Sequence, residues 1–216
     1  MNANDLDKKT ALYFQKKIKN VGKKLYSPYA WRMTHNRFHA LTAEILLQRT
    51  NADQVLPVYL DFIKKYKTPQ QFLNSPENIF VTLGLNWRYK IFINLCTEAA
   101  KLKEIPVNKD SLLILPGVGE YVASAMRSLH YNKREYIIDS NIVRLYGRFL
   151  GFKTDGETRR KKWFIELADR LTPSRSFKSY NYGLLDFTRI ICKRKPACKA
   201  CLLIKKCIFF SINNKK

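Results

Sequence analysis

Four cysteines gather near the end of the sequence, in the stretch CKRKPACKACLLIKKC. They are Cys192, Cys198, Cys201 and Cys207, and five, two and five residues separate them in turn. In an intracellular protein, such a quartet indicates metal binding rather than disulfides. Structural zinc sites more often use two distant C-x2-C pairs, whereas four thiolates in one short loop suit a compact iron–sulfur cluster. The spacing therefore favours a cluster and leaves zinc as the alternative. The fifth cysteine, Cys96, lies in an apolar stretch, which predicts a small buried side chain.

A second candidate site is the stretch LPGVGEYVASAMRSLH, residues 115–130, where one Pro and two Gly lie between apolar turns. This pattern predicts a helix end, a tight turn and a new helix. We expect Gly117 and Gly119 to take positive φ and to bring backbone N–H groups forward, beside the partial positive charge of the next helix. Such a turn can hold a phosphate. Taken alone, the pattern also fits an ordinary turn between two helices, with no ligand.

Two carboxylates are candidates for acid–base or electrostatic chemistry. Asp139 precedes Ser140, Asn141 and an apolar helical run, so its plainest role is that of an N-cap. Glu44 lies in FHALTAEILLQRT, on the rim of an amphipathic face formed by residues such as Leu41. Its plainest role is that of a solvent-facing glutamate.

The elements that must carry these groups are helical, because no segment alternates between apolar and polar residues for more than a few positions. The sequence therefore predicts an all-α chain. Pro57 falls inside one predicted helix and marks a break or kink there. The expected helices span residues 6–22, 36–50, 52–66, 69–74, 76–82, 87–103, 109–114, 119–130, 140–150, 157–171 and 176–190.

Composition identifies the partner class. The 216 residues are 46% hydrophobic, as in a globular protein, and 40 Lys and Arg against 17 Asp and Glu give a formal net charge of +23. So basic a chain favours a polyanion, with nucleic acid first and an anionic membrane surface second. No apolar run approaches the roughly 18 residues that a membrane span requires. The amino-terminal sequence is too charged for a signal peptide, so we expect an intracellular protein of the cytoplasm or nucleoid.

The order of these features, from YAWR at 29–32 to Cys207, resembles the helix-hairpin-helix DNA glycosylases of the endonuclease III superfamily that carry an iron–sulfur cluster. LPGVGEY is similar to their hairpin, IIDSN to the segment with the catalytic Asp, AEILLQRT to the helix beside the base pocket, and NYGLLDFTRIIC to the lead into the cluster loop. The W-R, E-I-L-L and D-x-N patterns are most similar to the branch of thymine/uracil mismatch and MutY-type adenine glycosylases. The spacing between the first two cysteines is one residue shorter than is usual in that family.

This resemblance implies two α-helical lobes, with double-stranded DNA and a flipped base at a cleft between them. One lobe would span residues 25–135 and contain the hairpin. The other would combine residues 1–24 with residues 136–216 and the cluster loop. The implied protein is a monomeric base-excision repair enzyme with a [4Fe-4S] cluster that is structural.

The resemblance also implies roles for single residues. Asp139 would stabilise the oxocarbenium-like transition state, with Asn141 orienting it, and Glu44 would act on the leaving base as an acid or hydrogen-bonding group. Tyr121 stands where strand-cleaving relatives carry a Lys, which predicts a monofunctional glycosylase. Gln48 would fill the vacated stack and Arg49 would contact the orphaned base. The hairpin residues expected at the DNA are Leu115, Gly117, Val118 and Gly119.

The substrate is the least determined feature. Adenine glycosylases of this branch usually carry a further carboxy-terminal domain, and here the sequence stops nine residues after Cys207, which favours thymine or uracil opposite guanine. Adenine opposite 8-oxoguanine or guanine remains the alternative. A catalytically silent DNA-binding protein or an iron–sulfur redox sensor is the alternative from another class, although neither would need Asp139, Glu44 and Tyr121.

Overall fold

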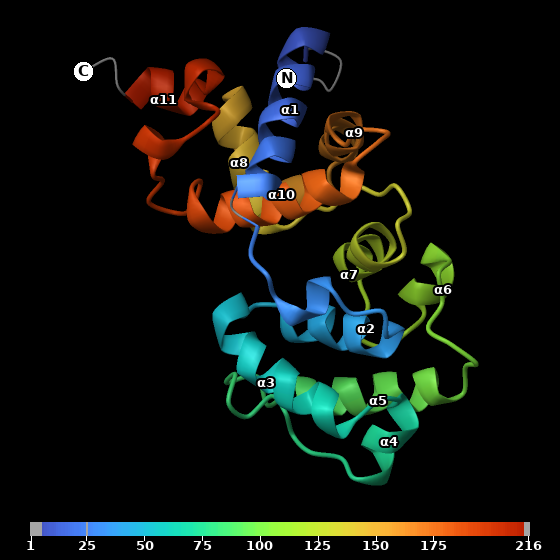
Figure 1. The fold of residues 1–216 in the computed structure, drawn as a ribbon. Coiled ribbons are helices and arrows are strands. Elements are labelled where there is room, and N and C mark those ends of the chain that lie inside the picture. The colour runs from blue at the N-terminus through green and yellow to red at the C-terminus, as the bar shows by residue number, and fades with distance from the viewer. Residues whose placement is uncertain (1–5, 25, 214–216) are drawn as a thin grey trace. The chain divides into compact units, whose positions relative to one another are not determined.

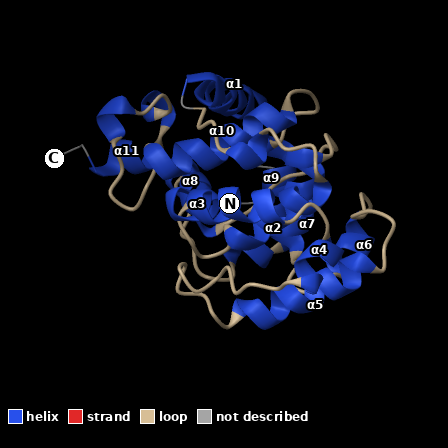
Figure 2. Cartoon of the chain, turned by 60° about the horizontal axis from the view of Figure 1, so that its bottom comes forward, coloured by secondary structure: helices blue, strands red, loops and turns tan. Residues whose placement is uncertain are grey.

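The computed structural model describes residues 6–24 and 26–213, and all regular elements within these ranges are helices (Figures 1 and 2). The prediction of an all-α chain is confirmed. No helix in the described ranges is long and apolar enough to cross a membrane. The α-helices are α1 (Lys8–Lys24), α2 (Arg37–Leu46), α3 (Ala52–Lys65), α4 (Pro69–Asn74), α5 (Arg88–Ala100), α6 (Lys109–Leu113), α7 (Glu120–Ala125), α8 (Ser140–Leu150), α9 (Lys162–Leu171), α10 (Phe177–Ile190) and α11 (Ile208–Asn213).

Several predicted helices differ from the structure. Residues 76–82 form no helix: 76–78 are irregular and 79–84 form successive turns. The Asn78 side chain accepts the Phe80 N–H, and Gly84 takes a left-handed conformation, which favour turns here. The predicted helix 157–171 begins only at Lys162, since Lys161 is extended and Thr158–Arg160 form a separate 3-10 turn. Helix α3 continues past Pro57, so the expected break is absent.

Three more differences lie at helix ends. The predicted helix 36–50 stops at Leu46, and Arg49 takes the left-handed conformation at φ 62°. The predicted helix 119–130 is α only as far as Ala125 and then widens into a π turn over Met126–His130. Helix α11 follows the last cysteine and was not expected from the sequence.

The chain divides into two compact units. The continuous unit runs from Pro28 to Lys133 and contains α2 to α7. Its core is one cluster of apolar and aromatic side chains centred on α2, in which every residue from Phe38 to Leu46 is buried. Because α2 is buried all round, its polar residues must find partners inside the unit. Thr42 bonds the Phe38 carbonyl, and His39 Nε2 lies 2.7 Å from the Tyr66 carbonyl oxygen.

The two-segment unit combines the chain up to Ser27 with the chain from Arg134 onward. Helix α1 packs against α10, and Figure 1 shows the two helices crossing. Gly183 permits this close approach, because a Cβ there would collide with the carbonyl oxygen of Ile18. Around this contact lie Phe14 and Tyr180, which are fully buried, with their ring centroids 6.4 Å apart.

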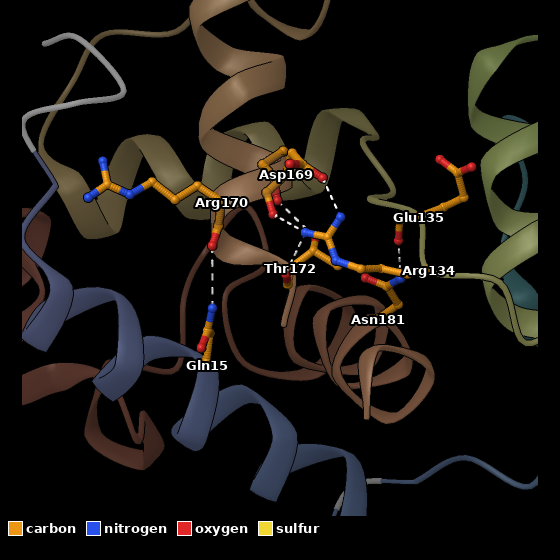
Figure 3. A network of polar contacts seen from close by, with 8 residues as sticks. Gln15, Arg134, Glu135, Asp169, Arg170, Thr172 and Asn181 are labelled. Atoms are coloured by element: carbon orange, nitrogen blue, oxygen red, sulfur yellow. Dashed lines mark hydrogen bonds and ion pairs between the residues drawn. The ribbon is translucent and has the colours of Figure 1, made fainter. Parts of the chain in front are cut away.

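Arg134, the first residue of the second segment, attaches that segment to α9 (Figure 3). Its guanidinium donates to Asp169 Oδ1 at 2.7 Å, to the Asp169 carbonyl at 2.7 Å and to the Thr172 carbonyl at 2.9 Å. These carbonyls belong to the end of α9, where a cation also complements the helix dipole. Nearby, Asn181 of α10 donates to the Glu135 carbonyl at 2.9 Å. The segment entering this unit is therefore held to two helices.

Candidate DNA-binding and catalytic sites

The predicted hairpin lies between α6 and α7. Gly117 has φ +78°, and a Cβ there would lie 2.8 Å from Ile91 Cγ2, so both conformation and space require glycine. Gly119 differs from the prediction of positive φ: its φ is −100°, an extended conformation open to any residue, and it is the N-cap of α7. The ends of the hairpin are tied by an ion pair at 3.0 Å between Lys109 and Glu120.

The hairpin's side chains differ in exposure. Leu115 and Val118 are 5% and 7% exposed and belong to the core, so only their backbones can reach a ligand. Ile114, by contrast, is 81% exposed at the end of α6. The sequence did not single it out, since an isoleucine in a helical pattern is normally assigned to the core.

Gln48 is fixed to the hairpin by two hydrogen bonds. Its Nε2 donates to the Gly117 carbonyl at 3.2 Å, and its Oε1 accepts from Arg88 Nη1 at 2.7 Å. Burial and the neighbouring charge of Arg49 lower the pKa of Arg88. The guanidinium carbons of Arg49 and Arg88 lie 5.9 and 4.6 Å from the ring centroid of Trp87, which is 54% exposed. The structure thus brings Gln48 and Arg49 together with two residues that the sequence did not indicate.

Glu44 is buried, which contradicts the interpretation of a solvent-facing rim residue. It is 2% exposed, and its Oε1 lies 3.1 Å from Nε2 of His130, whose side chain is 4% exposed. Oε2 has no hydrogen-bond partner among the described residues. Glu44 lies in the core because α2 is buried all round, and His130, on the π turn, supplies its partner there. Tyr121, the second residue of α7, is half-buried against the same core.

Asp139 and Asn141 belong to the two-segment unit, at the start of α8. Asp139 Oδ1 accepts the Ile142 N–H at 2.7 Å as the N-cap, and Oδ2 accepts from Asn141 Nδ2 at 2.9 Å. Asn141 is held in turn by Arg144, whose Nη1 donates to its Oδ1 at 2.8 Å. Arg144 Nη2 also donates to the Cys192 carbonyl at 2.9 Å. Both carboxylate oxygens are thus held, in a partly exposed position.

All four clustered cysteines line one small apolar cavity with residues such as Phe187 and Leu203. Burial, followed by the charges of the other three sulfurs, raises the pKa of Cys201 to about 11. Arg148 supports the loop, because its Nη1 donates to the Lys193 carbonyl at 2.7 Å and lies 3.7 Å from Cys192 Sγ. Within the described ranges, no three His, Cys, Asp or Glu side chains are arranged to hold a single metal ion. Four sulfurs around one cavity fit a polynuclear cluster better than one ion.

Comparison with known proteins identifies the family. The chain is 32% identical over 199 residues to a thymine/uracil-DNA glycosylase of Methanothermobacter thermautotrophicus, covering 84% of this chain and 86% of the relative. The solved structure of a thermostable thymine-DNA glycosylase matches with a TM-score of 0.87 and 31% identity, over 94% of this chain and 98% of that one. The chain belongs to the DNA glycosylase family of these relatives. No family model matches it.

Two further comparisons concern the fold of the glycosylase and a second kind of relative. An endonuclease III in a non-covalent complex with DNA has the same fold, with a TM-score of 0.79 at 21% identity, over 96% of this chain and 99% of that one. An adenine DNA glycosylase of Buchnera aphidicola subsp. Schizaphis graminum is 29% identical over 195 residues, and the match covers 85% of this chain but 55% of the relative.

Sequence reasoning about the glycosylase missed the side chains that hold its candidate residues. Arg88 holds Gln48, Arg144 holds Asn141, and His130 holds Glu44. Only Arg144 had a local signal, because it stands three residues after Asn141 on one helix face. Arg88 and His130 lie 40 and 86 residues from their partners, and nothing in the sequence pairs them.

Proposed function

We propose that this glycosylase removes uracil or thymine opposite guanine in double-stranded DNA, acting as a monomer in the compartment that holds the DNA. The observation that carries the proposal is the match to a thymine/uracil-DNA glycosylase over most of both chains. The match to an adenine glycosylase is slightly weaker in identity and covers little more than half of that relative. Adenine opposite 8-oxoguanine or guanine is therefore the second candidate.

Asp139 is the group we assign to the sugar. Cleavage of an N-glycosidic bond develops positive charge at C1′, and a carboxylate beside that atom stabilises the charge. The Ile142 N–H and the Asn141 amide hold both oxygens of Asp139, so the carboxylate is oriented before substrate binds. We assign Asn141 to this orientation.

Glu44 is the group we assign to the base. A pyrimidine leaves more easily when hydrogen bonds hold its ring, and a carboxyl group can accept from N3–H or, when protonated, donate to a carbonyl oxygen. Oε2 of Glu44 is buried and has no hydrogen-bond partner in the part of the chain that the structure describes. This supports the assignment, because a buried polar atom without a partner is costly unless a ligand satisfies it.

Tyr121 makes the reaction monofunctional in this proposal. A phenol cannot form a Schiff base with the sugar, so water attacks C1′ and the product is an abasic site. Borohydride should trap little enzyme on DNA containing a substrate base. Efficient trapping would show that an amine of this chain attacks the sugar and would reject the monofunctional assignment.

The DNA contacts we propose come from the hairpin and the end of α2. The backbone of the hairpin at Leu115, Gly117, Val118 and Gly119 would lie against the phosphates. The N–H groups of Leu115 and Val118 already donate to the Leu112 and Leu115 carbonyls, both at 3.1 Å, so the N–H groups of Gly117 and Gly119 would bind phosphate. Gln48 would enter the stack vacated by the flipped base, and Arg49 would meet the orphaned partner. The hydrogen bonds from Gln48 to the hairpin and to Arg88 support this by fixing its position.

The cysteine loop would hold a [4Fe-4S] cluster through Cys192, Cys198, Cys201 and Cys207. Bound there, the cluster would supply structural stability and no chemical step. Protein purified without oxygen should be yellow-brown and contain iron and labile sulfide. Cys198→Ser should lose the colour, and Cys96→Ser, which alters a buried cysteine outside the loop, should keep it. Stoichiometric zinc without iron would contradict this assignment.

Single-turnover base release on matched duplexes tests the substrate. Uracil and thymine opposite guanine should be removed faster than adenine opposite 8-oxoguanine, with undamaged duplex as the control. Fast adenine release with no pyrimidine release would establish the second candidate instead. Inactivity on all three duplexes, with DNA binding retained, would favour a non-catalytic binder or an enzyme for another modified base.

A further inference from the structure

His130 is the one side chain that contacts Glu44 by a hydrogen bond among the described residues. Its Nε2 lies 3.1 Å from Glu44 Oε1, and both side chains are almost completely buried, at 4% and 3% exposure. Because the two residues lie 86 positions apart, on the π turn and on α2, the contact is a tertiary one. It lies within the continuous unit.

The backbone that presents His130 is unusual. Over Met126–His130 the helix widens into a π turn, in which the Tyr131 N–H donates to the Met126 carbonyl at 3.0 Å. A π turn inserts a residue relative to the α-helical register and is often found at functional sites. Here it changes the register of the helix shortly before its end, at the residue that contacts Glu44.

The two oxygens of Glu44 are in different situations. Oε1 is engaged by His130, whereas Oε2 is buried and has no partner among the described residues. A pair that served stability alone would satisfy both oxygens, since a half-satisfied buried carboxylate is costly. The arrangement instead holds one oxygen and leaves the other for an incoming group.

We propose that His130 is a positioning residue for base release: its Nε2–H holds Glu44 Oε1 and thereby presents Oε2 to the base. This inference rests on the proposed role of Glu44 in handling the leaving base. His130 itself does not touch the base, so its effect passes entirely through Glu44.

A double-mutant cycle on the full chain tests the proposal, with single-turnover base release from the best of the three duplexes as the readout. His130→Leu should slow release at least about tenfold, while the affinity for DNA containing an uncleavable abasic analogue stays near wild type. His130→Gln, which restores an N–H donor, should recover most of the rate. In a Glu44→Ala background, His130→Leu should cause no further loss, because its partner is gone.

His39→Leu is the matched control. His39 is also a buried histidine, and it lies on α2 with Glu44, but its ring contacts the Tyr66 carbonyl. Its replacement should lower stability and leave the rate of base release unchanged. His130 lines a cavity of about 430 Å³ with Ala40 and Tyr131, so a changed side chain at 130 has room to be accommodated.

The outcomes separate the two hypotheses. If Glu44→Ala is impaired but His130→Leu is as fast as wild type, the inference is wrong and the role of Glu44 stands. An equal loss from His130→Leu in the wild-type and Glu44→Ala backgrounds would show a merely structural role and also overturn the inference. If Glu44→Ala releases the base at the wild-type rate, the proposed role of Glu44 fails, and the inference fails with it.

Discussion

Asp139 combines a structural and a chemical role, and two substitutions separate them. Asn is as good an N-cap as Asp, so Asp139→Asn can keep the 2.7 Å hydrogen bond from the Ile142 N–H. We expect its melting temperature to fall less than that of Asp139→Ala, because the cap is kept while the hydrogen bond from Asn141 Nδ2 to Oδ2 is lost. Without the negative charge, base release should slow by at least about 10³-fold, which corresponds to roughly 4 kcal/mol of transition-state stabilisation.

Asp139→Ala should lose both roles. Removing the cap costs about 1 kcal/mol, which for a chain of this size lowers the melting temperature by about 2–4 °C. Thermal unfolding and single-turnover kinetics on the same preparations measure the two losses. Asp155→Asn is the matched control, because Asp155 also accepts a backbone N–H at a helical turn of the same unit, from Glu157 at 3.0 Å. It should keep the wild-type rate.

The result that refutes this reasoning is an Asp139→Asn variant that releases the base at near the wild-type rate. In that case the charge of Asp139 contributes nothing to the transition state, and its role is only to cap α8. A fall in melting temperature as large for Asn as for Ala would instead refute the capping argument.

Two further predictions concern stability. Gly183→Ala should lower the free energy of unfolding by about 1–3 kcal/mol, because the new Cβ collides with the Ile18 carbonyl. Gly156→Ala should have little effect, since a Cβ there meets nothing within 4 Å. Denaturant unfolding of the two variants compares these losses. Burial lowers the pKa of His39 from 6.5, so below that pH the unfolded chain binds more protons than the folded one and stability falls. His39→Leu should remove the part of this pH dependence that His39 causes. Unfolding experiments at about pH 7.5 and about pH 5.5 should therefore show a smaller difference in stability for the variant than for the wild type. An equal difference would contradict the prediction.

Local patterns predicted much of the fold. The turn at Gly117 follows from residue chemistry within a few positions, and the structure has the left-handed conformation expected there. The same logic failed at Gly119, where an extended N-cap needs no glycine. It failed again at residues 76–82, because the turns there depend on the Asn78 side chain and on Gly84, which compete with helical periodicity.

Tertiary contacts set the limit for the candidate site. A charged residue at the edge of an apolar face is assigned to solvent by any periodicity argument. Glu44 is nevertheless buried on the central helix α2, where His130 reaches it from another part of the chain. Arg88 at Gln48 is a second example of the same kind. The sequence therefore predicts candidates for the reacting groups but not the side chains that hold them.

The two-segment unit has a consequence for biosynthesis. Helix α1 is made early, yet its partners come late: Tyr13 donates to the Leu202 carbonyl across 189 residues, and Ile18 packs on Gly183. Phe14 cannot be covered until α8 is made, because its ring packs on Tyr146 and Phe149, with centroids 5.5 and 4.8 Å away. Ile18 waits longer, until Gly183 of α10 is made. The continuous unit is a single segment, Pro28–Lys133, so its core can form meanwhile. We therefore expect a nascent chain in which the continuous unit is folded while the apolar face of α1 is still exposed. Helix α1 is then the segment that a chaperone would bind.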